Sequence, residues 1–105
     1  MKNAIMMGII TVWNRYNPRF SDHDWEPDQQ AAVMADTVCL AIVTAAKVDT
    51  SRRASVRKFI AGCRERSEIL TEEGEGWKAD VWAMAEEVAR RYIGAPAMKM
   101  WRFEA

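Results

Sequence analysis

PDQQAAVMADTVCLAIVTAAKV, residues 27–48, is the longest stretch of the chain with one continuous helical pattern. Pro27 suits the first position of a helix, where a backbone N–H is not needed, and Asp28 places negative charge at the positive end of the helix dipole. The apolar residues of this stretch are mostly alanine and form one wide arc at helical spacing. Because alanine lets neighbouring helix axes approach closely, we expect this helix to lie at the centre of the fold.

Three further segments have apolar residues at helical spacing: residues 2–16, 51–70 and 77–93. In the first, the β-branched content and Gly8 leave a strand open as an alternative for residues 4–13. The last is expected to end in a left-handed residue at Gly94, and Pro96 prevents its continuation. The sequence therefore predicts an all-α fold in one domain, residues 1–105. About four helices would pack around residues 27–48, with a short aromatic C-terminal tail.

The composition excludes several classes of protein. The chain carries 15 acidic and 15 basic residues, so no overall field attracts nucleic acid or an anionic membrane. Its longest apolar run lies within residues 4–13 and is too short to span a bilayer, and no cleavage site for a signal peptide follows it. The two cysteines fall inside predicted helices, as reduced core residues do in a cytoplasmic protein.

No motif for catalysis or metal binding is present. His23 lies in an acidic loop, but Pro27 stands where a calcium loop requires glycine and Val33 stands where it requires glutamate. Cys39 and Cys63 lie on predicted apolar faces, where a thiol is not activated. We therefore predict no catalytic residue, no metal and no cofactor, and we expect the chain not to be an enzyme.

The charge is unevenly distributed along the chain. Between residues 49 and 70 six basic residues stand against three acidic ones, whereas the flanking segments are slightly acidic. Such a helix can dock an acidic protein surface or phosphates. Alternatively, it is a solvated face whose charges pair with Glu72, Glu73 and Glu75. The candidate binding residues of this basic helix are Arg52, Arg53, Arg57, Lys58 and Arg64.

A second candidate surface is aromatic and rich in methionine. Surfaces of this kind suit protein partners, although the tail could instead fold back and cap the core. Its candidate residues are Trp82, Met98, Met100, Trp101 and Phe103.

Two resemblances bear on function. Tyr16-Asn17-Pro18-Arg19-Phe20 after an amphipathic helix resembles the N-terminal part of phage helicase-loader proteins, over about a fifth of the chain. A small helical chain without catalytic motifs also resembles the accessory proteins of phages and mobile elements, many of which, anti-CRISPR proteins included, block a host complex.

From these features we expect a non-enzymatic regulatory protein that binds and inhibits a larger host assembly, such as a nucleic-acid-processing complex. A protein is the expected partner, and no membrane is involved. The alternatives are a DNA- or RNA-binding regulator that uses helix 51–70, as a homodimer, and a replication accessory protein of the helicase-loader kind. An enzyme acting through His23 comes third.

Overall fold

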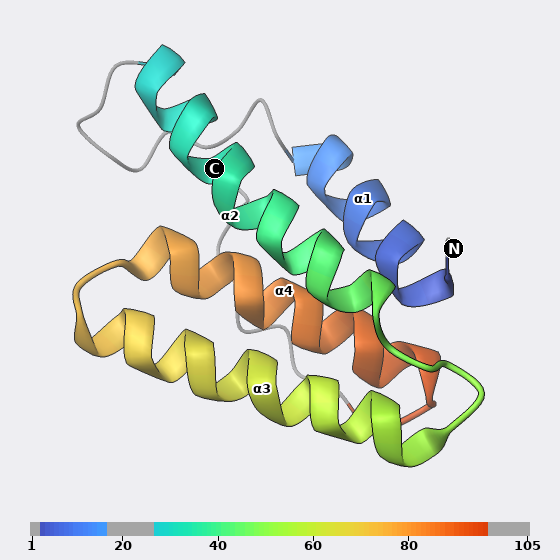
Figure 1. Ribbon diagram of the computed structural model, residues 1–105. Coiled ribbons are helices and arrows are strands. Elements are labelled where there is room, and N and C mark those ends of the chain that lie inside the picture. Colours follow the sequence, from blue (N-terminus) through green and yellow to red (C-terminus); the bar gives the residue numbers. More distant parts are fainter. Residues whose placement is uncertain (1–2, 17–26, 97–105) are drawn as a thin grey trace.

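The computed structural model describes the backbone of residues 3–16 and 27–96 and the side chains of residues 3–15 and 36–96 (Figure 1). Within the described backbone there are four helices: α1 (Ala4–Tyr16), α2 (Pro27–Ala46), α3 (Arg53–Glu72) and α4 (Gly76–Tyr92). No strand occurs in these two ranges. The all-α prediction is confirmed, and the strand alternative for residues 4–13 is wrong.

The helix ends follow from local chemistry. Asn3 caps α1, because its Oδ1 accepts a hydrogen bond of 2.8 Å from the Met6 N–H. Its Nδ2 also donates to the Ala45 carbonyl at 2.9 Å, so the start of α1 is joined to the end of α2. Gly94 follows α4 with a φ of 69°, which confirms the left-handed residue expected there.

The centre of the fold is α4, and not residues 27–48 as expected from the alanine pattern. Figure 1 shows α4 between α3 on one side and α1 with α2 on the other, and α4 packs against all three. Its bulky residues Trp77, Val81 and Met84 are buried, whereas α2 leaves Leu40 and Val43 about half exposed. Alanine permits close packing, but burial of large side chains contributes more free energy, and α4 carries them.

The contact between α1 and α4 depends on one glycine. A Cβ atom on Gly8 would lie 2.6 Å from Cγ1 of Val88, well inside van der Waals contact. Gly8 therefore lets the two helices approach more closely than any other residue would allow.

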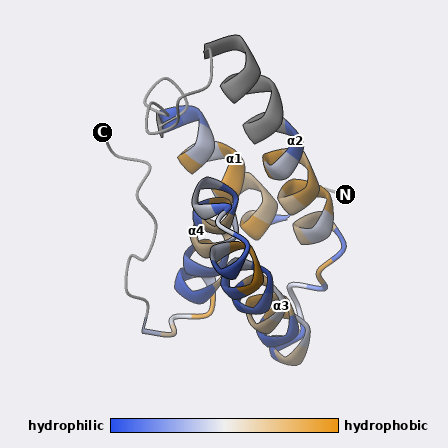
Figure 2. Ribbon diagram, turned by 90° about the vertical axis from the view of Figure 1, so that its left-hand side faces the viewer, coloured by the Kyte–Doolittle hydropathy of each residue, from blue (hydrophilic) through white to orange (hydrophobic). Residues whose placement is uncertain are grey.

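The hydrophobic and charged residues are distributed unequally among the helices. Figure 2 shows α1 and the coloured part of α2 as mainly hydrophobic, with most of the hydrophilic residues on α3 and α4. None of the helical segments described here is both long and apolar enough to cross a membrane.

Candidate functional site

The predicted basic helix is divided by its own buried stripe. Val56, Phe59, Ile60 and Cys63 of α3 point into the core and separate the cations into two groups. Arg57 and Arg64 line a hollow of about 380 Å³ beside the C-terminal part of α4. Lys58 lies on the opposite flank, toward the end of α2. The five candidate cations thus do not form one surface.

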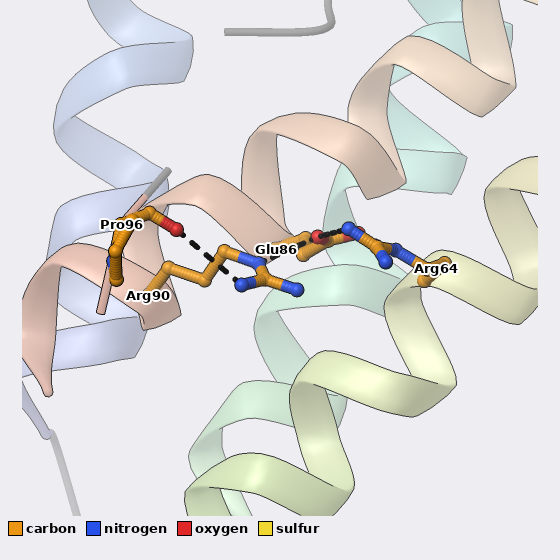
Figure 3. Close-up of polar contacts among 4 residues, drawn as sticks. All are labelled: Arg64, Glu86, Arg90 and Pro96. Atoms are coloured by element: carbon orange, nitrogen blue, oxygen red, sulfur yellow. Dashed lines mark hydrogen bonds and ion pairs between the residues drawn. The ribbon is translucent and has the colours of Figure 1, made fainter. Parts of the chain in front are cut away.

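The flank of α3 that carries Arg57 and Arg64 is hydrogen-bonded to α4. Arg64 donates to both carboxylate oxygens of Glu86, at 2.9 and 3.4 Å, and Arg90 donates to Glu86 at 2.7 Å (Figure 3). Arg90 also donates to the Pro96 carbonyl at 3.4 Å. The hydrogen bond to Glu86 and the negative charge of this carboxylate raise the pKa of Arg64. Arg53 donates to the Ile93 carbonyl at 3.0 Å.

Arg53 and Arg64 therefore hold α3 against α4. The sequence had suggested Glu72, Glu73 or Glu75 as partners of the basic helix. In the structure the carboxylate bound by Arg64 is Glu86, and Glu75 lies 4.0 Å from Lys78 instead. The pairing occurs across two helices, because residues 64 and 86 meet only when α3 and α4 pack antiparallel.

The second flank forms a groove of about 400 Å³ between the end of α2, α3 and α4, which we call the basic groove. Its cations are Lys47, Lys58 and Arg66, and no carboxylate is among its lining residues. Its remaining lining residues are apolar or small, with two hydroxyl groups: Thr44, Val48, Ser55, Phe59, Gly62, Cys63 and Trp82. The arrangement combines apolar surface with positive charge.

The cations of the basic groove differ in how they are held. The guanidinium carbon of Arg66 lies 4.5 Å from the ring centre of Trp82, in a cation–π contact. Lys47 and Lys58 are exposed, and neither takes part in the ion pairs found among the described residues. These two lysines are positioned to bind an anionic group.

Of the aromatic candidates, the structure describes Trp82 alone. Its side chain is buried, with 3% exposed, so it is not the exposed anchor expected from the sequence. It contributes to the candidate surface through the basic groove. The other aromatic and methionine candidates lie outside the described residues: Met98, Met100, Trp101 and Phe103. His23 lies outside them as well.

The two cysteines have different environments. Burial, helped by the negative charge of Glu86, raises the pKa of the Cys63 thiol to about 12, so it is not a nucleophile at neutral pH. Cys39, expected on an apolar face, is exposed on α2. Among the side chains described, those of residues 3–15 and 36–96, no cluster of His, Cys, Asp and Glu could hold a metal ion.

Two of the three cations of the basic groove, Lys47 and Arg66, were not among the candidates. Arg66 lies eight positions after Lys58, and this spacing places both on one flank of α3, a signal that the sequence contains. Lys47 comes from the end of another helix, so only the packing brings it to the groove.

No protein-family model, no curated protein and no solved structure matches this chain.

Proposed function

We propose that this chain is a non-enzymatic binding protein that docks an acidic segment of a partner protein in the basic groove. The observation that carries the proposal is the composition of the groove: three cations, an apolar floor and no lining carboxylate. Acidic side chains of the partner would pair with Lys47 and Lys58, and one bulky apolar side chain would cover Phe59.

A protein segment fits this groove better than nucleic acid does. Stacking of a base needs an open aromatic face, and Arg66 already lies over the ring of the buried Trp82. Arg53 and Arg64, which could add phosphate contacts, are hydrogen-bonded to Ile93, just after α4, and to Glu86 of α4. The net charge of the whole chain is zero, so the chain as a whole does not attract a phosphate backbone.

Binding of this kind suits a small regulator. The chain would act in equal amounts with its target, by covering an acidic surface that a larger assembly needs. We propose inhibition of a host assembly that processes nucleic acid, as small accessory proteins of phages carry out. A reducing, cytoplasmic setting agrees with the free thiols of Cys39 and Cys63.

The test compares two double charge reversals in an affinity capture from host lysate. Lys58→Glu with Arg66→Glu alters the basic groove. Arg52→Glu with Arg57→Glu makes the same change of charge elsewhere on the predicted basic helix. We expect the groove variant to lose the captured partner and the control variant to keep it, with both variants folded by circular dichroism.

A parallel gel-shift assay with duplex DNA separates the protein partner from nucleic acid. A DNA complex that weakens steeply with salt and is lost in the groove variant would replace the proposal with the DNA-binding alternative. Equal capture by both variants would show that the groove is not the binding site.

A further inference from the structure

The outward face of α2 carries an apolar pair between two opposite charges. Val38, Ala41 and Ala45 face the core, and their exposed fractions are 2% or less. On the other side of the helix, Leu40 is 55% exposed and Val43 is 51% exposed.

Asp36 lies one turn before this apolar pair and Lys47 one turn after it, and both are exposed. Lys47 directly follows the last helical residue, and its N–H still donates to the Thr44 carbonyl, at 3.2 Å. It therefore continues the path of the helix. Side chains three and four residues apart share a helix face, so these four residues form one stripe, which we call the α2 stripe.

The α2 stripe is symmetric about the midpoint between Ala41 and Ile42. Leu40 and Val43 lie equally far from this point, and so do Asp36 and Lys47. When a helix packs antiparallel against its own copy about a two-fold axis at this point, each residue lies beside its counterpart on the other side of the midpoint. Leu40 would then meet Val43 of the second copy, and Asp36 would meet its Lys47.

We infer that α2 is a self-association surface, on which a second copy of this chain packs antiparallel through the α2 stripe. The apolar pair forms the centre of the contact, and two Asp36–Lys47 ion pairs, one at each end, fix its register and direction. A parallel arrangement is disfavoured, because it would place Asp36 beside Asp36 and Lys47 beside Lys47. The charges thus select one arrangement of the two copies.

The contact is small. Four residues from each copy fall short of the twenty or so that each side of a stable interface supplies, so we expect a dissociation constant between about 10 µM and 1 mM. Since the α2 stripe shares only Lys47 with the basic groove, this inference does not rest on the proposed function. A failure of self-association would leave the groove proposal as it stands.

The test is a charge swap read by sedimentation equilibrium over protein concentrations up to about 1 mM. Asp36→Lys places lysine beside Lys47 of the second copy at both ends of the contact, so we expect association to weaken about tenfold. Asp36→Lys with Lys47→Asp restores opposite charges, and association should return. Glu65→Lys, the same change of charge on the exposed surface of α3, should leave association unchanged.

Two results would overturn the inference. One is a wild-type protein that stays monomeric at the highest concentration. The other is a dimer that the single and the double substitution affect equally, since repulsion at the ends of the contact should appear in the first and disappear in the second.

Discussion

Glu86 joins α4 to α3 through a buried carboxylate. Its carboxylate is buried, with 6% of the residue exposed, and it accepts hydrogen bonds from Arg64 of α3 and Arg90 of α4. A buried carboxylate is tolerated because these two guanidinium groups replace the water that it loses. The same contacts give Arg64 a structural partner within the fold, although about half of its side chain is exposed.

At this residue the substitution Glu86→Gln keeps the shape of the side chain and removes its charge. We expect the free energy of unfolding to fall by about 1–2 kcal/mol, because hydrogen bonds between charged groups are replaced by weaker ones next to two cations. Urea denaturation followed by circular dichroism measures the change. Glu72→Gln on the exposed end of α3 is the control, with an expected change below about 0.5 kcal/mol. If the two variants unfold at the same urea concentration, the Arg64–Glu86–Arg90 contacts do not stabilise the fold.

Two glycines that both lie within helices have different surroundings. Gly8 in α1 faces Val88 of α4, where an added Cβ atom would lie 2.6 Å from a methyl group. Beyond its own stretch of helix, Gly62 in α3 has no atom within 4 Å of the position that a Cβ would take. Only the first glycine is required by the packing.

Alanine substitution should therefore change stability in opposite directions at these two sites. Gly62→Ala should raise the free energy of unfolding by about 0.5–1 kcal/mol, since alanine favours the helix. Gly8→Ala brings the same helical preference but should lower stability by about 1–2 kcal/mol, because Val88 is branched at Cβ and cannot turn away.

Chemical denaturation measures both changes, and Val88→Ala in the Gly8→Ala background should recover part of the loss. Equal stabilisation by the two alanines would contradict the close approach of α1 and α4.

The helices and their packing also show which structural features can be predicted from the sequence. The predicted start of each helix lies within two residues of the observed one. Signals such as Pro27 at the start of α2 and Gly94 after the end of α4 act on the local backbone, so the sequence alone reveals them. The central position of α4 was not predicted. All the helices have apolar faces, and spacing alone does not say which faces meet. For the same reason the burial of Trp82 and the pairing of Arg64 with Glu86 were missed, since both depend on contacts between helices.

The whole molecule is electrically neutral, yet its packing concentrates positive charge at one place. Lys47 from the end of α2 and two cations of α3, Lys58 and Arg66, meet around apolar surface. Arg53 and Arg64 are instead hydrogen-bonded to residues at the end of α4 and within it. The candidate surface thus includes one of the five cations chosen from the sequence, Lys58, and two others. Neutral composition therefore does not exclude a binding site that depends on charge.

The most direct test of the basic groove is a display selection of random peptides on the immobilised protein, repeated on the Lys58→Glu, Arg66→Glu variant. We predict that the wild-type protein selects peptides in which aspartate and glutamate flank one bulky apolar residue, and that the variant no longer binds them. Selected peptides without acidic residues, or peptides that bind both proteins equally, would contradict the assignment of the groove as the binding site.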